Sequence, residues 1–274
     1  MARVRGPLLL IGSGRMGGAL LEGWIGEGLA ADEAFVVEPD SGARERVRER
    51  LGVAAVAEAK ALPADLAPEA VVVAVKPQMM AKTLPAYRPI VERGAVVLSI
   101  AAGTTIARFE AAFGEATAVV RAMPNTPAAI GRGVSALVAN PRTSAAQKDM
   151  CLALMQAVGD AVWIDDEEQM HAVTAMSGGG PAYVFLLIEV LAKAGIANGL
   201  PEALARRLAR ATVIGSGALA AADDSPVEIL RQNVTSPGGT TQAALAVLMD
   251  EGSGMQPLFV SAITAGTRRS RELA

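Results

Sequence analysis

Three glycines near the start of the chain, at positions 12, 14 and 17, have the spacing of a loop that binds phosphate groups. The apolar run 7–11 precedes them, and a segment with helical spacing, 18–28, follows. In this context the first glycine permits a tight turn, the second lets the backbone approach a pyrophosphate, and the third lets the helix pack closely on the sheet. Free N–H groups at the helix start favour phosphate oxygens. We therefore expect a dinucleotide to bind here, at Ile11, Gly12, Ser13, Gly14, Arg15, Met16 and Gly17.

An acidic residue, Glu38, follows the second expected strand, 34–37, roughly 20 residues after the glycine loop. A carboxylate at this place can accept hydrogen bonds from the hydroxyls of the adenine ribose, and it repels a 2′-phosphate. Glu38 therefore favours NADH over NADPH. Two alternatives to this interpretation stay open. Arg44 or Arg46 could bind the phosphate of NADPH, and Glu38 could be a solvated carboxylate.

Two further glycine clusters, 177–181 and 233–241, lie in the second half of the chain. Each combines serine, glycine and proline before an expected helix, and such a start forms a nest of free N–H donors suited to a carboxylate. Helix capping without a ligand is the alternative. Small residues and prolines also fill the loops 74–78, 99–103 and 121–127, which would let a nicotinamide ring approach or would serve as ordinary turns.

Strands that alternate with helices position the first of these motifs. Apolar runs predict strands at 7–11, 34–37, 71–75, 95–100, 118–122, 134–139 and 161–164, and their continuous valine and isoleucine content is typical of a sheet covered on both faces. After residue 165 the pattern predicts only helices, at 181–198, 201–222, 226–233, 240–250 and 256–272. The expected fold is α/β, with an N-terminal Rossmann domain of doubly wound, mostly parallel sheet at 1–164 and an all-helical domain at 165–274. Helix 181–198 is apolar nearly all round, which favours a subunit interface.

Composition excludes several classes of function. The net charge of −3 gives no basic face, so we expect no nucleic acid and no anionic membrane as a partner. The single cysteine, Cys151, belongs to no metal-binding cluster, and we expect it to be a buried apolar residue on a helix. Apolar stretches such as 211–222 fall short of the roughly 20 residues that span a bilayer, and we expect a cytoplasmic protein.

At this point the sequence resembles the pyrroline-5-carboxylate reductase family over nearly its whole length. The segments that carry the resemblance are IGSGRMGGA at 11–19, AVKPQ at 74–78, SIAAG at 99–103, RAMPNTP at 121–127, AVTAMSGGGPAYVF at 172–185, GLP at 199–201, LRQNVTSPGGTT at 230–241 and TRRSREL at 267–273. The segment VTSPGGTT is the most specific of them, and the order of all eight agrees with the family.

The resemblance implies hydride transfer from NADPH or NADH to the C=N carbon of 1-pyrroline-5-carboxylate, a cyclic imino acid, which gives L-proline. It implies a site between the Rossmann domain and the helical domain of a homodimer, with rings of dimers common. Ser236, Gly239 and Thr240 match the start of the helix that binds the substrate carboxylate. Thr241 matches the hydroxyl that reaches the ring nitrogen, and it is the one catalytic residue we expect. Positions near the cofactor are matched by Ala74, Lys76, Ala101 and Asn233. No metal is expected.

The chain departs from the family at three places. Gly179 stands where the family usually has serine, Glu38 where it often has a hydroxyl residue, and His171, the single histidine, where it often has an acid. We expect His171 on a helix surface. A reductase of a related cyclic imino acid stays an alternative, since one methylene changes binding by only ~1–3 kcal/mol. So do a β-hydroxyacid dehydrogenase-like enzyme, although no lysine follows Gly180 before Lys193, and a dinucleotide sensor without enzyme activity.

Overall fold

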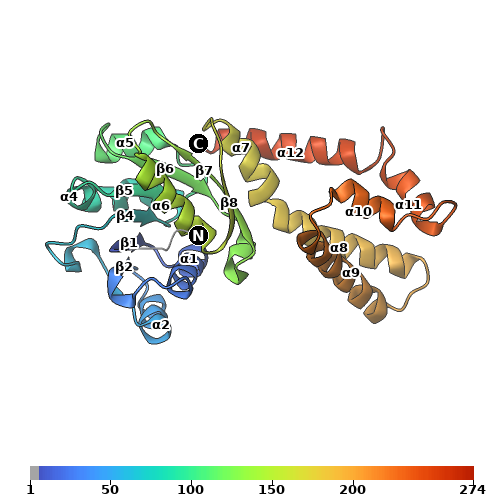
Figure 1. Ribbon diagram of the computed structural model, residues 1–274, viewed down its shortest axis with the longest axis horizontal. Helices are drawn as coiled ribbons and strands as arrows, with labels where there is room; N and C mark the ends of the chain where they lie inside the picture. Colours follow the sequence, from blue (N-terminus) through green and yellow to red (C-terminus); the bar gives the residue numbers. More distant parts are fainter. Residues whose placement is uncertain (1–5) are drawn as a thin grey trace. The chain divides into compact units, whose positions relative to one another are not determined.

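The computed structural model describes residues 6–274, so the first five residues of the expected 1–164 domain lie outside the described part. Its described strands form one sheet in the order β3-β2-β1-β4-β5-β6-β7-β8 (Figure 1). All neighbouring pairs are parallel except β6 and β7. The strands are β1 (Leu8–Ile11), β2 (Ala34–Val37), β3 (Ala54–Val56), β4 (Ala70–Val73), β5 (Val96–Ser99), β6 (Val119–Met123), β7 (Gly133–Ala139) and β8 (Gly159–Trp163).

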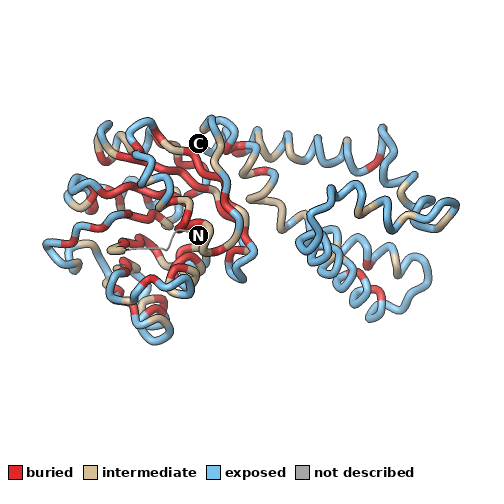
Figure 2. Tube along the Cα trace, viewed as in Figure 1, coloured by how far each residue is buried: buried red, intermediate tan, exposed pale blue. Residues whose placement is uncertain are grey.

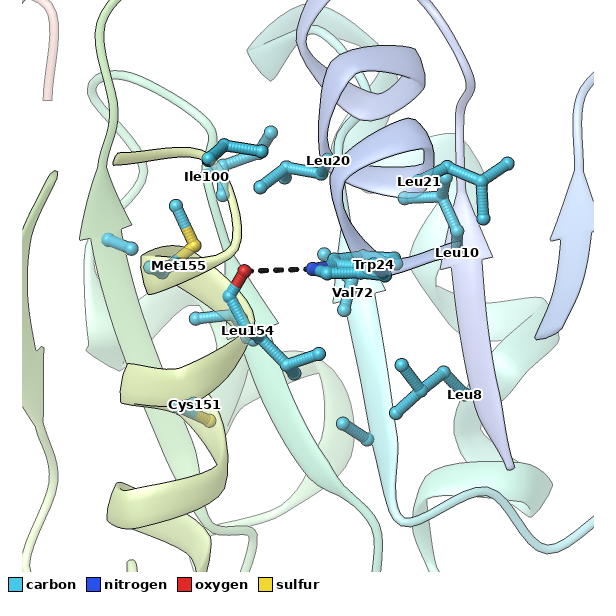
Figure 3. Close-up of a cluster of buried hydrophobic side chains, with 14 of the residues drawn as sticks. Leu8, Leu10, Leu20, Leu21, Trp24, Val72, Ile100, Cys151, Leu154 and Met155 are labelled. Atoms are coloured by element: carbon cyan, nitrogen blue, oxygen red, sulfur yellow. Dashed lines mark hydrogen bonds between the residues drawn. The ribbon is translucent and has the colours of Figure 1, made fainter. Parts of the chain in front are cut away.

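Helices cover both faces of this sheet. Side chains of α1 and α6 pack on one face around Trp24, whose indole N–H donates to the carbonyl of Leu154 at 2.8 Å (Figure 3). Side chains of α3, α5 and α7 pack on the other face around Phe109 and Met170. The helices are α1 (Arg15–Gly26), α2 (Ser41–Leu51), α3 (Met80–Thr83), α4 (Arg88–Val91), α5 (Ile106–Phe113), α6 (Ala145–Gln156) and α7 (Gln169–Val173).

The predicted strands agree with this sheet, and the predicted fold class is confirmed. Alternate residues of β1 enter opposite cores, Leu8 and Leu10 on one face and Leu9 and Ile11 on the other, as expected of a sheet covered on both sides. The edge strand β3 was not predicted, because three residues are too few to give a periodic signal. Cys151 is buried on α6, as predicted.

The chain divides into two compact units, and the division differs from the expected boundary at 164/165. The first unit runs to Gly178 and includes Thr267–Ala274, and the second is Gly179–Gly266. Residues 165–178 belong to the first unit because α7 is anchored in its core, where Met170 is fully buried beside Phe109. The chain therefore connects the two units twice, after Gly178 and before Thr267.

The second unit is helical, with α8 (Gly180–Ala197), α9 (Glu202–Ala222), α10 (Val227–Asn233), α11 (Thr240–Leu248) and most of α12 (Met255–Glu272). Small residues let α8 and α9 pack closely, since a Cβ on Gly195 would lie 3.3 Å from the Cβ of Ala205. Only a few of its side chains are buried, and the tube of Figure 2 is exposed along most of these helices. Large apolar residues such as Phe185 and Val190 of α8 are at least half exposed.

This exposed apolar surface needs a partner or an apolar environment. By length and composition alone, the helical run Gln169–Ala197 is long and apolar enough to cross a membrane, and only 6% of its most apolar window is buried in the chain. The same exposure is what a helix has when it packs against a second subunit. The expectation of a subunit interface at 181–198 therefore rests on a large, unpaired apolar face.

Candidate active site

The glycine loop between β1 and α1 is held by close backbone contacts. Gly12 has a φ of +91°, which favours glycine, and a Cβ on it would lie 3.1 Å from the carbonyl oxygen of Ala74. A Cβ on Gly17 would lie 2.2 Å from the carbonyl oxygen of Gly12, so no larger residue fits. The first and third glycines of the motif therefore have the packing roles that the sequence predicted for them.

The second glycine, Gly14, faces open space instead. It is the N-cap residue of α1, without a capping side chain, and a Cβ on it would have no atom within 4 Å. The first intrahelical bond runs from the N–H of Gly18 to the carbonyl of Gly14 at 2.7 Å, so the three preceding amides have no acceptor within the helix. Open space in front of free amides at a helix start is the geometry that fits a pyrophosphate.

Glu38 lies next to this loop, at the end of β2. Its carboxylate accepts hydrogen bonds from the backbone N–H of Ser13 at 2.8 Å and from that of Asp40 at 3.0 Å. A hollow of about 420 Å³ borders these groups, lined by Ser13, Gly14, Arg15, Gly18, Ala19, Glu22, Glu38, Asp40, Ala43, Arg46 and Ala129. The structure thus brings the acidic residue and the glycine loop to one hollow, as the sequence predicted.

The two arginines considered beside Glu38 differ in their surroundings. Arg44 donates from Nη1 to the carbonyl oxygens of Glu38 and Pro39, at 2.8 and 2.6 Å, and so stabilises the turn after β2. Arg46 lines the hollow itself. Of the two, Arg46 is therefore the one placed to meet a group bound in the hollow.

Three other cofactor-side residues follow β4, which pairs with β1, and β5, which pairs with β4. Ala74 contacts the glycine loop, since a Cβ on Gly17 would lie 3.1 Å from its Cβ. Lys76 is exposed at the start of the 3₁₀ turn Pro77–Met79. Ala101 is buried in loop 99–103, where its N–H donates to the Ser99 hydroxyl at 3.2 Å. Parallel neighbouring strands end at one edge of a sheet, so these residues and the glycine loop share that edge.

Loop 121–127 carries an asparagine that the sequence did not single out. The side chain of Asn125 accepts from the N–H of Val134 at 3.0 Å and donates to the carbonyl of Ser177 at 3.2 Å. It therefore joins β7 to the turn that follows α7. An asparagine between two prolines is the only signal that the sequence offered for this role.

The first glycine cluster, 177–181, does not form the nest that we expected. Thr174–Gly178 is a turn of π-helix directly before α8, and Gly179 has right-handed helical angles, φ −81° and ψ −18°. The amides there follow a helical turn instead of a free loop, so the expectation of an open carboxylate nest is wrong. Gly178 packs against Met123, since a Cβ on it would lie 2.6 Å from the methyl carbon at the flexible end of that side chain.

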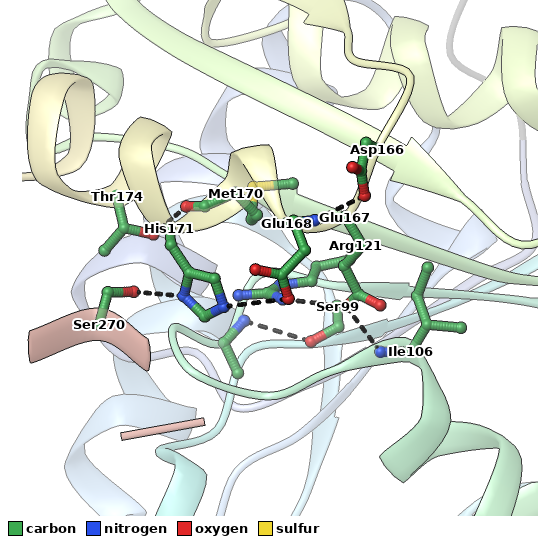
Figure 4. A network of polar contacts seen from close by, with 11 residues as sticks. Ser99, Ile106, Arg121, Asp166, Glu167, Glu168, Met170, His171, Thr174 and Ser270 are labelled. Atoms are coloured by element: carbon green, nitrogen blue, oxygen red, sulfur yellow. Dashed lines mark hydrogen bonds and ion pairs between the residues drawn. The ribbon is translucent and has the colours of Figure 1, made fainter. Parts of the chain in front are cut away.

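A buried polar network lies beneath α7 (Figure 4). Arg121 of β6 is buried, and its Nη1 lies 2.9 Å from Oε1 of Glu167. The same oxygen accepts from the N–H of Ile106 at 2.9 Å, at the start of α5. Among the described residues, the second guanidinium nitrogen of Arg121 and the Thr104 hydroxyl are buried without a partner. This network could not be predicted from the sequence, because its members are far apart in the chain.

His171 was predicted on a helix surface, and this prediction is wrong. The residue is only 5% exposed, and its Nδ1 shares a hydrogen bond of 2.9 Å with the hydroxyl of Ser270 (Figure 4). Ser270 lies in the last turns of α12, so the contact that buries His171 comes from the end of the chain. Its Nε2 lies 4.0 Å from the exposed carboxylate of Glu168.

The second glycine cluster opens α11, as predicted. Gly238 has a φ of +71°, and the N–H of Gly239 donates to the carbonyl of Ser236 at 3.0 Å, which turns the chain into the helix. The first intrahelical bond runs from Ala243 to Gly239 at 3.2 Å, so the amides of residues 240–242 have no acceptor within the helix. The side chains of Ser236, Thr240 and Thr241 are exposed there.

These exposed hydroxyls and free amides suit a carboxylate or another small anion. Asn233, the last residue of α10, is exposed as well. No group of three or more acidic, histidine or cysteine side chains able to hold a metal ion occurs within residues 6–274.

Known proteins resemble both halves of the chain. Residues 167–273 match the family model described as pyrroline-5-carboxylate reductase dimerisation, and residues 8–103 match the one described as NADP oxidoreductase, coenzyme F420-dependent. A pyrroline-5-carboxylate reductase of Pseudomonas aeruginosa is 38% identical over 97% of this chain and 96% of its own length. One of Synechocystis is 38% identical over 96% of this chain and 97% of its own length.

Solved structures agree with these relatives. The structure of a pyrroline-5-carboxylate reductase from Coxiella burnetii superimposes with a TM-score of 0.92 at 34% identity and covers 98% of both chains. A pyrroline carboxylate reductase from Plasmodium falciparum, solved with NADP bound, gives a TM-score of 0.79 at 28% identity over 97% of both chains. The likeness thus extends over both compact units.

Proposed function

Because the chain belongs to the pyrroline-5-carboxylate reductase family, we propose that its two open helix starts hold the two reactants of that reaction. The protein is an oxidoreductase that reduces 1-pyrroline-5-carboxylate to L-proline by hydride transfer from NAD(P)H. The observation that carries the proposal is that α1 and α11 both begin with free amides.

In the first unit, the glycine loop binds the cofactor. The amides of Arg15, Met16 and Gly17 donate to the pyrophosphate, and Ile11, Gly12 and Ser13 shape the turn before them. Gly14 supports this assignment because no atom occupies the space where its side chain would be. When bound, the nicotinamide supplies the hydride. Ala74, Lys76 and Ala101 border the cofactor at the same sheet edge.

In the second unit, the start of α11 binds the substrate. Ser236, Gly239 and Thr240 hold the carboxylate of the imino acid through backbone amides and hydroxyls. Asn233 is assigned to the cofactor because it matches a cofactor-side position of the family. The Thr241 hydroxyl meets the ring nitrogen. A protonated imine accepts hydride more readily, so this nitrogen needs a hydrogen-bond partner and no strong base. A hydrogen bond to a charged group contributes about 1.5–3 kcal/mol, and catalysis otherwise comes from positioning. The reaction needs no metal.

We propose that NADH is the preferred cofactor. The Glu38 carboxylate lies at the hollow beside the glycine loop, where it accepts hydrogen bonds from ribose hydroxyls and repels a 2′-phosphate. Arg46 lines the same hollow and offers a positive charge to a phosphate, whereas Arg44 is bonded to backbone carbonyls. The preference therefore depends on the balance between Glu38 and Arg46.

The chain forms a homo-oligomer through its helical unit. We propose that the dimer buries the exposed apolar faces of α8 and its neighbours, and that dimers associate further into rings. We propose that this oligomer is cytoplasmic and contacts neither membrane nor nucleic acid. A covered apolar face and the net charge of −3 support this proposal.

The proposal is tested by oxidation of NADH and NADPH at 340 nm with purified protein and 1-pyrroline-5-carboxylate. We expect substrate-dependent oxidation that falls about 10–100-fold in Thr241→Ala, because one hydrogen bond to a charged nitrogen is lost. Thr241→Ser is the matched control, since it keeps the hydroxyl and should keep most of the activity. Full activity in Thr241→Ala would sink the role of Thr241. No oxidation of either cofactor would contradict the assigned substrate, and the six-membered cyclic imino acid would be assayed next.

A further inference from the structure

Two segments carry the chain between its units, and in the first unit they contact each other. One is α7 with the π turn Thr174–Gly178, after which the chain enters the helical unit. The other is Thr267–Ala274, which contains the end of α12 and the residues after it, where the chain returns. Both segments belong to the first unit, so their contact lies within that unit.

The buried contact between these segments is the hydrogen bond between His171 and Ser270. The atoms Nδ1 and Oγ are 2.9 Å apart, and the two residues are 5% and 7% exposed (Figure 4). Ser270 is the one buried residue of α12. A second link, between Arg271 and Glu168 at 3.7 Å, is exposed on both sides and contributes little. The buried hydrogen bond is thus the specific tie between the two segments.

The end of α12 also contacts the loop that follows β5. A Cβ on Gly103, which has a φ of +71°, would lie 3.1 Å from the carbonyl oxygen of Leu273. Loop 99–103 contains Ala101 and lies at the sheet edge where we place the cofactor. The returning segment therefore packs against a loop of the proposed active site, three residues after its bond to His171.

We propose that His171 is a positioning residue for the reduction. Its imidazole fixes the segment 267–274 against loop 99–103, a loop that borders the proposed cofactor site in the first unit. This inference rests on the proposed function. His171 does not touch the reactants, because it is buried in the first unit with Nδ1 bonded to Ser270.

The chemistry of the pair explains why an apolar residue would not serve at position 171. Loss of the imidazole would leave the Ser270 hydroxyl buried without a partner, and the last turn of α12 would move to reach water. Displacement of a reacting group by about 1 Å, even from a distant change, is enough to lower the rate of a reaction about 100-fold.

Kinetics of His171→Ala, His171→Asn and Ser270→Ala test the proposal in the full-length protein. His171→Ala should lower kcat about 10–100-fold, whereas the Kd for NADH should change less than threefold. His171→Asn should recover at least a third of the activity, since an asparagine amide occupies the place of Nδ1. Ser270→Ala should match His171→Ala, and the double variant should be no worse than either. Glu168→Gln, at an exposed neighbour, should behave as the wild type.

Amide hydrogen exchange gives a readout that needs no turnover. In His171→Ala, residues 99–104 and 267–274 should lose protection together, while the glycine loop keeps it. This separates the inference from the proposed function, because exchange is measurable even if 1-pyrroline-5-carboxylate is not the substrate. Unchanged kcat and unchanged protection in Ser270→Ala, which removes only a hydroxyl and should fold, would overturn the proposal. Equal losses in His171→Asn and His171→Ala, or additive losses in the double variant, would overturn it as well.

Discussion

Gly14→Ala should separate cofactor binding from stability, because its position is open in the folded chain. A Cβ there meets no atom within 4 Å, and φ −62° with ψ −166° lies outside the left-handed region. Alanine reduces the freedom of the unfolded chain, which stabilises by ~0.4–1 kcal/mol, but it is a poorer N-cap than glycine. The free energy of unfolding should therefore stay within about 1 kcal/mol of the wild type.

The same methyl group would stand between the pyrophosphate and the amides at the start of α1. The loss of one hydrogen bond to a charged phosphate costs about 1.5–3 kcal/mol, so we expect the Kd for NADH to rise about 10–100-fold. Calorimetric titration with NADH measures the affinity, and thermal unfolding at one fixed protein concentration measures stability.

Gly17→Ala is the matched control for this experiment. Its Cβ would lie 2.2 Å from the carbonyl oxygen of Gly12, a backbone atom, so the loop must shift. Overpacking of this kind costs about 1–3 kcal/mol, and the control should lose stability and affinity together. If Gly14→Ala bound NADH as tightly as the wild type, the cofactor would not pass over Gly14, and the assignment of the glycine loop would be refuted.

Three further predictions concern single side chains. Glu38→Ser should raise the NADPH/NADH ratio of kcat/KM at least about tenfold, since it removes a charge that repels the 2′-phosphate, and an unchanged ratio would mean that Glu38 does not set the preference. Glu167→Ala should lower the free energy of unfolding by about 3 kcal/mol, the low end for a broken buried pair, because the Glu167 side chain is 29% exposed. In an Arg121→Met background the same substitution should lower it much less, since no buried charge is left unpaired. Urea unfolding measures both losses, and equal losses would show that the unpaired charge of Arg121 does not cause the destabilisation. Burial raises the pKa of the Cys151 thiol to about 12, so a thiol reagent should label it only as fast as the protein unfolds, and rapid labelling of the native protein would contradict its burial.

Features that depend on neighbouring residues were predictable from the sequence. The strand β1, the glycine loop and the helix α1 follow one another within 20 residues, and each is specified by local apolar spacing or by glycine. The start of α11 is local in the same way, since Gly238, Gly239 and the threonines after them form the turn themselves. Both halves of the proposed site could therefore be found without the structure.

Features that depend on distant residues were not predictable. The pattern around residues 177–181 looked like a helix start that follows an open loop, yet α7 and a π turn lead directly into it. Asn125 gives no periodic signal, because its two partners lie in β7 and in that π turn. The pairing of Arg121 with Glu167 spans 46 residues. The local pattern of a single sequence does not indicate which distant residues are in contact.

His171 shows why this difference matters for function. Its spacing on a short helix gave no reason to place it inside, and its partner Ser270 lies 99 residues further along the chain. A helix start that binds an anion is formed by neighbouring residues, so each unit can form its own start independently of the other. Catalysis also depends on how the loops that border the cofactor are held, and loop 99–103 packs against Leu273, a contact that no local pattern specifies. The buried bond between His171 and Ser270 fixes the segment that contains Leu273, which is why its loss should lower turnover while both binding loops stay intact.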